Sequence, residues 1–440
     1  MGLLRKTSMI CLIGLRSIYT KQTHMASGTE FQQERRNLRQ AQKLALIIFL
    51  IVLGSCNKST QGNEDASLEK LQGLNDSIRK AFAPDKRVAV YDISISRQGN
   101  TAIVKGETSL PEALNFLKTE LDKKNYDLTD QVVILPDNSI GETPYAVVNN
   151  SVANIRSKPK HSSELATQAV LGIPLKVLKI EGDFYLIQTP DKYISWVDHG
   201  GVRLMTEMEY ATWNKSEKVI YLKPFGSVYK NPANELDVIS DITLGSILKR
   251  LGETENYFVV EYPDMRRGYL LKSESERYEN WVNELKPSKE SIELYARSLI
   301  GMPYLWGGTS SKGMDCSGFT KTVYRMNGFV IPRDASQQIF AGKVVDPELG
   351  FKNLEKGDLM FFGKKQTDST RQKVTHVAIW LGNDSGEFIH ASGRVRISSI
   401  NEDSQNYDAF NKGRYLGSRR YLGIEDPLLT HLTSSIKLTP

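Results

Sequence analysis

A repeat of 73 residues in the middle of the chain restricts its fold more than any other feature. Three dipeptides recur at this spacing, namely Leu171-Gly172, Leu175-Lys176 and Pro190-Asp191, which return as Leu244-Gly245, Leu248-Lys249 and Pro263-Asp264. Both copies consist of short alternating apolar segments separated by Gly, Asp and Pro turns, a pattern that favours small antiparallel barrels. We therefore expect two related β domains, over residues 145–208 and 215–275.

A single cysteine downstream of the repeat has the surroundings of a nucleophile. Glycines form a loop before Asp315, and apolar residues at Phe319, Val323 and Met326 follow Cys316 at helical spacing. Asp315 is therefore expected to cap a helix that begins at Cys316. A helix N-terminus favours the thiolate, which is the reactive form of cysteine. A buried structural cysteine is the alternative.

Two histidines follow in segments that read as adjacent strands. His376 lies within 374–381 and His390 within 387–391, and the turn 383–386 joins the two segments. Such histidines can be structural, or they can bind a metal, but no H-x-x-x-H or clustered carboxylate spacing accompanies them. We expect a Cys–His–His arrangement of nucleophile, base and orienting residue, with no metal or cofactor.

These motifs resemble the NlpC-type cell-wall cysteine peptidases, a papain-like family. The resemblance rests on Tyr304, Trp306, the run 315–318, Arg333-Asp334, the run 357–359, the run 375–379 and the run 388–391. The segment 153–157 in the first repeat resembles bacterial SH3-like domains. The implied fold is multidomain, with a papain-like α+β catalytic domain and its antiparallel sheet over 287–424. Two SH3-like β-barrels and a small α+β module over 67–140 would precede it.

The resemblance also implies roles for individual residues. Cys316 attacks an amide carbonyl, His376 moves the proton, His390 orients His376, and Tyr304 helps to bind the oxyanion. The residues expected to bind substrate are Glu164, Trp196, Trp306, Asp315, Ser317, Asp334 and Ser336. Glu164, from the first barrel, would meet the substrate's free amine. Asp315 as a simple helix cap, and Tyr304 and Trp196 as core aromatics, remain alternatives.

The resemblance further implies a substrate class, namely stem peptides derived from peptidoglycan. The expected cut lies between γ-D-glutamate and the following diamino acid, in peptides with a free N-terminal L-Ala, which is a recycling activity. The alternatives are an endopeptidase acting on intact peptidoglycan, a sugar–peptide amidase, and a non-catalytic SH3-like protein that binds the wall.

The first 55 residues have the layout of an export signal. Four basic residues between 35 and 43 precede the apolar run 44–53, and Leu53-Gly54-Ser55-Cys56 resembles a lipoprotein cleavage box. We expect Met25 as a possible start, a lipid at Cys56, a polar tether over 56–66, and a periplasmic lipoprotein anchored to a bacterial membrane. The alternative is a plain signal peptide.

The net charge does not point to a nucleic-acid partner. The chain carries 57 basic and 51 acidic residues, of which residues 1–55 hold eight and two. The remainder therefore has 49 of each sign, and this balance gives no basic surface for a polyanion.

Overall fold

The computed structural model describes residues 65–382 and 384–432, which divide into two compact units. Among the described residues, the first unit contains 65–84, 94–103 and 115–129, and the second contains 85–93, 104–114, 130–382 and 384–432. The predicted export signal and Cys56 lie outside the described residues. No helix in the described part of the chain is long and apolar enough to cross a membrane.

A helix–strand module precedes the repeat. Its elements are α3 (Asp65–Phe82), β1 (Tyr91–Gln98), β2 (Thr101–Thr108), α4 (Pro111–Asp122) and β3 (Asp127–Ile134). The three strands form one sheet in the order β1-β2-β3. The sequence predicted both helices and the first two strands, whereas β3 was not predicted. The segment 85–93, which follows α3 and includes the first three residues of β1, belongs to the second unit.

The repeat forms two sheets of seven strands each. The first has the order β10 (Val202–Met205), β4 (Tyr145–Val148), β7 (Pro174–Glu181), β8 (Phe184–Gln188), β9 (Ile194–Asp198), β5 (Val152–Arg156) and β6 (Leu165–Val170). The second has the corresponding order β17 (Ser275–Arg277), β11 (Lys218–Tyr221), β14 (Ile247–Glu253), β15 (Tyr257–Glu261), β16 (Arg267–Leu271), β12 (Phe225–Asn231) and β13 (Asn234–Thr243). Six of the seven strands begin 73 positions after their counterparts, as Pro174 and Ile247 illustrate.

Residues 287–424, which contain Cys316 and are called the catalytic region here, are built on an antiparallel sheet of six strands. Its order is β21 (Lys343–Val344), β26 (Tyr415–Arg420), β22 (Leu359–Lys364), β23 (Lys373–Trp380), β24 (Glu387–Ser392) and β25 (Arg394–Ser399). Four of these strands were predicted, but β21 and β25 were not. Alternate residues of β22 face opposite sides of the sheet, so Phe361 packs toward the helices and Phe362 packs into a second apolar cluster.

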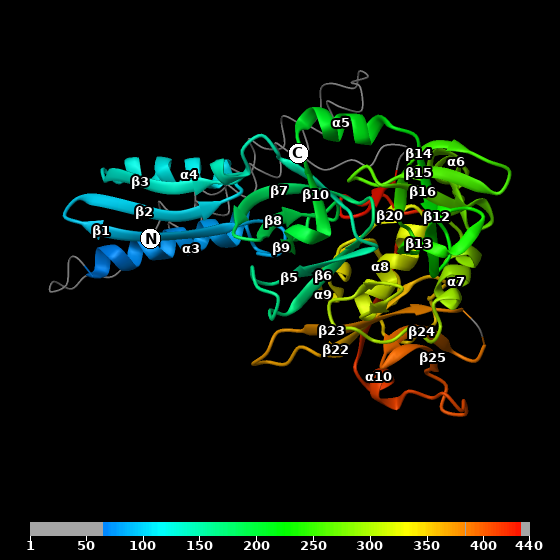
Figure 1. Cartoon of the computed structure of the whole chain (residues 1–440). Helices are drawn as coiled ribbons and strands as arrows, with labels where there is room; N and C mark the ends of the chain where they lie inside the picture. Colours follow the sequence, from blue (N-terminus) through cyan, green and yellow to red (C-terminus); the bar gives the residue numbers. More distant parts are fainter. Residues whose placement is uncertain (1–64, 383, 433–440) are drawn as a thin grey trace, which may run out of the picture. The chain divides into compact units, whose positions relative to one another are not determined.

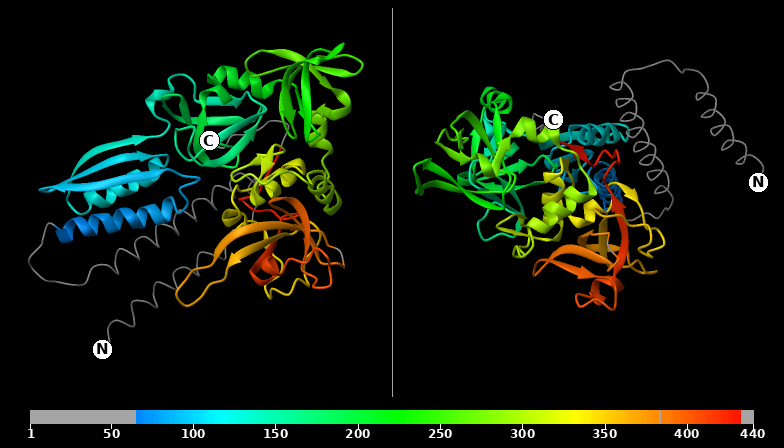
Figure 2. Two further views of the ribbon diagram at one scale, coloured as in Figure 1. Left: turned by 60° about the horizontal axis from the view of Figure 1, so that its bottom comes forward. Right: turned by 90° about the vertical axis from the view of Figure 1, so that its right-hand side faces the viewer.

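Helices α8 (Cys316–Met326) and α9 (Ala335–Gln338) pack against one face of this sheet, as Figure 1 shows, and Figure 2 gives two further views. The other helices of this region are α6 (Tyr278–Glu284), α7 (Lys289–Ser298) and α10 (Ala409–Gly413), and α8 contacts both β23 and β24. The predicted cap Ser288 accepts a hydrogen bond from the backbone N–H of Ser291 at the start of α7. Phe319 and Val323 of α8 are fully buried, because they face the sheet.

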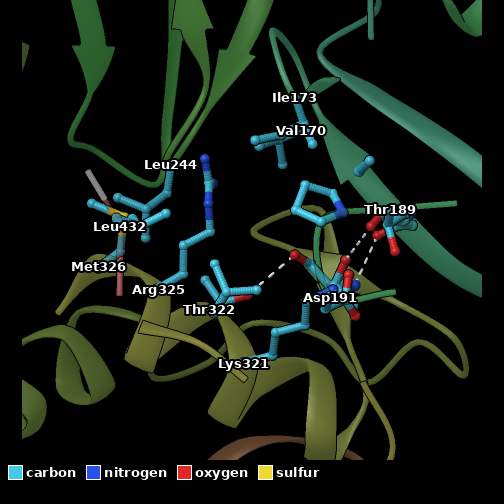
Figure 3. Close-up of a pocket in the computed structure, with 15 residues that line it drawn as sticks. Val170, Ile173, Thr189, Asp191, Leu244, Lys321, Thr322, Arg325, Met326 and Leu432 are labelled. Atoms are coloured by element: carbon cyan, nitrogen blue, oxygen red, sulfur yellow. Dashed lines mark hydrogen bonds and ion pairs between the residues drawn. The ribbon is translucent and has the colours of Figure 1, made fainter. Parts of the chain in front are cut away.

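The first barrel shares its core with the catalytic region. Val170 and Leu175 of the barrel belong to the same buried cluster as Phe319 of α8. A cavity of about 70 Å³ lies at this junction, and Figure 3 shows Lys321 and Asp191 beside it. Lys321 Nζ is 2.8 Å from Asp191 Oδ2, and the two side chains are 15% and 2% exposed. A buried ion pair therefore joins α8 to the first barrel.

Candidate active site

Cys316 is the first residue of α8 and is buried at the helix N-terminus. The Asp315 side chain caps the helix, since its Oδ1 accepts the backbone N–H of Gly318 at 2.7 Å. Gly318 is required there, because a Cβ at this position would lie 2.0 Å from the carbonyl oxygen of Gly308. The loop at Gly308 and the first turn of α8 are thus packed too tightly for any side chain at position 318. This close packing fixes the direction in which α8 leaves the loop.

The environment of Cys316 keeps its thiol protonated in the unliganded protein. Burial, followed by the negative charge of Asp315, raises the pKa of Cys316 to about 12. The backbone N–H groups of Val377 and Ser317 hydrogen-bond the sulfur and act in the opposite direction. The bond from Val377 also shows that β23 passes directly against the helix terminus, with His376 as the neighbouring residue.

The two histidines are linked to each other. His376 Nε2 and His390 Nδ1 are 2.7 Å apart, and His390 Nε2 is 3.0 Å from the hydroxyl oxygen of Ser398. Strand register explains the first contact. Ile379 of β23 pairs with Ile389 of β24, so the same register sets His390 opposite Ala378, diagonally across from His376 on one face. The hydrogen bond to His390 leaves Nδ1 of His376 for another partner.

Both imidazoles are neutral in this environment. Burial, and then the neighbouring His390, lowers the pKa of His376 well below its usual value. Burial, together with Arg396 and Arg414, lowers the pKa of His390 to about 3. His376 therefore has the protonation state of a base that can accept a proton from the thiol.

Asp315 and Ser317 are held in a buried network with Arg333. The two Asp315 oxygens accept five hydrogen bonds, from Gly307 N, Gly318 N, Ser317 Oγ, Arg333 Nη1 and Arg333 Nη2. Arg333 also donates to Ser317 Oγ at 3.0 Å and to Thr167 Oγ1 of the first barrel at 2.9 Å. Since Asp315 is already fully hydrogen-bonded, the geometry favours its role as a helix cap over contact with substrate.

A cleft of about 450 Å³ opens beside Cys316. The catalytic region and the first barrel both line it, and they are joined across it by Trp306 Nε1, which donates to Glu164 Oε1 at 2.7 Å. Tyr304 also lines the cleft, and burial raises its pKa. The other predicted ligands that line the cleft are Asp315, Ser317, Asp334 and Ser336.

The structure differs from the prediction at Trp196, which does not line this cleft. Trp196 packs against a separate apolar cluster that contains Leu178, Leu186 and Ile194. The aromatic residue of the first barrel that lines the cleft is instead Tyr193, which comes just before β9 begins. Strand alternation explains the error, because the phase of a five-residue strand cannot be read without its pairing partners.

Two cations in the cleft were not predicted. Arg87 comes from the segment between α3 and β1, and Lys373 is the first residue of β23. Arg87 Nη1 is 2.7 Å from Asp334 Oδ2 and 2.9 Å from Ser336 Oγ. Asp334 thus already has a cationic partner in the absence of substrate.

A buried thiol at a helix N-terminus, next to linked histidines on an antiparallel sheet, defines a papain-like cysteine peptidase. Residues 301–414 match the NlpC/P60 family, and residues 151–203 match the bacterial SH3 domain. The chain is 30% identical over 273 residues to the Gamma-D-glutamyl-L-lysine dipeptidyl-peptidase of Bacillus cereus, an alignment that covers 60% of this chain and 77% of that protein. The chain belongs to the NlpC/P60 family of cysteine peptidases.

A second relative and one solved structure support the same assignment. The chain is 34% identical over 155 residues to the Murein DD-endopeptidase MepS/Murein LD-carboxypeptidase of Escherichia coli, covering 34% of this chain and 72% of that protein. The crystal structure of an NlpC/P60 family protein from Bacillus cereus is similar, with a TM-score of 0.54 at 26% identity. That match covers 63% of this chain and 99% of the other.

Proposed function

We propose that this protein hydrolyses the bond between γ-D-glutamate and the following diamino acid in stem peptides with a free N-terminal L-Ala. The observation that carries the proposal is the Glu164–Trp306 contact, by which the first barrel supplies a carboxylate to the cleft beside Cys316. A wall with a negative charge at this end suits a substrate that ends in an ammonium group. The similarity to a relative named for γ-D-glutamyl-L-lysine cleavage supports the same bond specificity.

The chemical steps follow from the protonation states at the site. His376 accepts the thiol proton of Cys316, and the thiolate attacks the amide carbonyl to form a tetrahedral intermediate. The backbone N–H of Cys316 and the hydroxyl of Tyr304 stabilise the oxyanion. His376 then protonates the leaving amine, and water hydrolyses the resulting thioester. The N–H groups that already bind the sulfur stabilise the thiolate when it forms.

His390 acts by positioning His376. Its bond to Nε2 fixes the ring so that Nδ1 is the nitrogen that takes up the proton. Ser398 extends this chain and in turn holds the His390 ring. Trp306, Tyr193, Asp334 and Ser336 form the walls that bind the peptide, while Asp315 and Ser317 support the nucleophile and the helix terminus.

The domain boundaries and the export route are part of the proposal. We assign the module to 67–140, the barrels to 145–208 and 215–275, and the peptidase domain to 287–424. Export as a lipoprotein attached through Cys56 rests on the sequence box at 53–56. Replacing Cys56 with Ala is expected to release the protein from membranes without changing the kcat/KM for a soluble peptide. A wild-type protein that is soluble and carries no acyl mass would contradict the anchor.

The test of the activity compares L-Ala-γ-D-Glu-L-Lys with its N-acetylated form. The free peptide is expected to be cleaved to L-Ala-γ-D-Glu and lysine, with a kcat/KM roughly a hundredfold higher than for the acetylated peptide, because acetylation removes the charge that Glu164 pairs with. Cys316→Ala should abolish both reactions. Equal cleavage of the two peptides, together with digestion of intact sacculi, would favour a general wall endopeptidase, as the similarity to MepS suggests.

A further inference from the structure

The cavity between α8 and the two barrels contains a partly buried arginine without a partner. Arg325 extends from the last turn of α8 into the space between Leu244 and Val170, as Figure 3 shows. A Cβ at position 245 would lie 2.5 Å from Arg325 Nη1, so the guanidinium lies directly against Gly245 of the second barrel. Within residues 65–382 and 384–432, no group forms a hydrogen bond or an ion pair with this guanidinium. Its five N–H donors are therefore available to a ligand.

Every other polar side chain that lines the cavity has a hydrogen-bond partner in the described part of the chain. These side chains are Gln168, Thr189, Asp191, Thr309, Lys321 and Thr322. The contrast is clearest within α8, where Lys321 and Arg325 are four residues apart and so lie on one face of the helix. Lys321 has Asp191 as its counterion, whereas Arg325 has none among the described residues.

The charges around the cavity leave one positive charge in excess. Two cations, Lys321 and Arg325, face a single carboxylate, Asp191, among the described residues that line the cavity. Burial lowers the pKa of Lys321 but Asp191 opposes this, while burial lowers the pKa of Arg325 with no carboxylate to oppose it. A partly buried cation without a counterion is costly, and an anion that pairs with it removes this cost. The cavity therefore favours an anionic ligand.

The walls of the cavity determine the kind of anion. Phosphate needs donors on several sides, whereas a planar guanidinium pairs with both oxygens of one carboxylate. The remaining walls suit an aliphatic group, because they are formed largely by Val170, Ile173, Leu244, Met326 and Leu432. The cavity volume of about 70 Å³ is roughly half of the ~150 Å³ that holds a benzene ring, so it fits about two to four carbon atoms.

This cavity is separate from the substrate cleft. The two share no lining residue in the described part of the chain, and Cys316 and Arg325 lie about 14 Å apart along the axis of α8. Strand β6 nevertheless contacts both, since its first two residues line the cleft and its last two line the cavity. A ligand in the cavity would hold β6 against α8 without touching the substrate.

We propose that this cavity binds a small aliphatic carboxylate through Arg325, and that the ligand stabilises the junction between α8 and the two barrels. A free short-chain acid and the C-terminus of a peptide that ends in a small residue present the same chemistry. The site does not depend on the cleavage specificity proposed above, because none of its residues lines the cleft.

The experiment titrates the complete protein with sodium butyrate in a calorimeter, with butyramide as the neutral analogue and sodium chloride at equal ionic strength. Wild type is expected to bind butyrate with a Kd of about 1 mM or below, a range open to a ligand of this size. Butyrate at about ten times the Kd should raise the Tm by about 2 °C, whereas butyramide and chloride should not. Tighter binding of N-acetyl-alanine than of butyrate would indicate a peptide C-terminus as the ligand, and the reverse order a free acid.

Variants at Arg325 separate ligand binding from a structural role. Arg325→Met retains the aliphatic stem and should weaken butyrate binding by about tenfold or more. Without ligand it should be at least as stable as wild type, because an unpaired cation beside Lys321 is removed. Arg325→Lys keeps the charge but loses the planar fork, so its affinity should be intermediate. Arg297→Met is the matched control, since Arg297 of α7 is 42% exposed and pairs with Glu293, and it should bind butyrate as wild type does.

Three results would overturn the proposal. One is equal affinity of wild type and Arg325→Met for butyrate, or no binding by wild type. A second is a lower Tm of unliganded Arg325→Met, which would show that the arginine stabilises the fold through a partner of its own. The third is equal binding of butyrate and butyramide by wild type, a comparison that requires no variant. Because none of these measurements uses peptide cleavage, a failure of the proposed function would leave them interpretable.

Discussion

The two barrels share one strand order but differ in the surface that each presents to its neighbours. Asp191 in the first barrel and Asp264 in the second are equivalent in the repeat. Asp191 is 2% exposed and pairs with Lys321 of α8, whereas Asp264 is 30% exposed and pairs with Arg266, two residues away in its own copy. Asp191 thus joins the first barrel to α8 through a buried ion pair, whereas Asp264 forms a more exposed pair within its own copy and accepts a hydrogen bond from Asn149 Nδ2 of the first barrel.

A second pair of equivalent positions differs in burial, although both members contact the catalytic region. The Gln168 side-chain oxygen accepts hydrogen bonds from Thr309 N and Ser310 Oγ of the catalytic region, both at 3.0 Å. Its counterpart Asp241 forms an exposed ion pair with Lys312 at 2.6 Å. The barrel scaffold is common to both copies, and the residues that make the first barrel part of the cleft are changes on its surface. The repeat therefore accounts for the shared fold, and the contacts of the first barrel with the cleft come from positions at which the two copies differ.

The largest expected effect comes from breaking the buried pair between Asp191 and Lys321. Asp191→Asn leaves Lys321 buried without a counterion, which costs about 3–5 kcal/mol of unfolding free energy. Burial already lowers the pKa of Lys321 although Asp191 opposes this, so the uncompensated amine is expected to lose its proton more readily. Denaturant unfolding of the variant measures the loss.

The matched control for this prediction is Asp264→Asn in the second barrel. Its partner Arg266 is 41% exposed, and such a surface pair contributes about 1 kcal/mol or less. The variant should therefore unfold nearly as wild type does. Equal destabilisation by the two substitutions would show that the exposed pair of Asp264 stabilises the protein as much as the buried pair of Asp191 does.

A smaller effect is expected on activity when the cleft carboxylate is removed. Glu164→Ala should reduce kcat/KM for the free-amine peptide by about 30- to 100-fold, equivalent to about 2–3 kcal/mol, because the ammonium loses its charged partner. The repeat offers Asp237 as the equivalent position in the second barrel. Asp237→Ala should leave kcat/KM unchanged, and a comparable loss would mean that the second barrel also binds substrate.

The features that the sequence predicted well depend on local patterns. The start of α8 at Cys316 follows from its Asp cap and apolar spacing, and the repeat follows from turn residues at fixed intervals. The histidine strands were identified for the same reason. Each of these signals is visible in the sequence itself, so no tertiary information was needed.

The features that were missed depend on contacts between distant parts of the chain. Arg87 stands in Pro84-Asp85-Lys86-Arg87, a polar run that by itself indicates a solvated loop. Only the fold brings it to Asp334, and no local pattern encodes that approach. Tyr193 and Trp196 were similarly ambiguous, because the side of the barrel that each faces depends on strand pairing.

The smallest expected effect is on the way the free energy of unfolding changes with pH. It distinguishes a buried histidine of the catalytic sheet from exposed histidines of the first barrel. The first barrel carries His161 and His199 at its surface, whereas the catalytic sheet buries His390 completely. The folded-state pKa of His390 is about 3, below the usual value of 6.5, so the unfolded chain takes up a proton first as the pH falls. Stability contributed by the neutral ring is therefore complete above pH 6.5 and decreases as the pH drops below it, by about 1.4 kcal/mol per unit.

Between pH 6.5 and 5 the loss from His390 amounts to about 2 kcal/mol. His390→Gln should make the curve of unfolding free energy against pH less steep over this interval, because one of the two buried histidines with a lowered pKa is removed while His376 keeps its own contribution. His199→Gln, at the surface of the first barrel, is the control and should leave the slope as in wild type. Denaturant unfolding at half-unit steps of pH measures both variants. An unchanged slope in His390→Gln would show that the ring is not held neutral, and with it the supporting role of His390 behind His376 would fall.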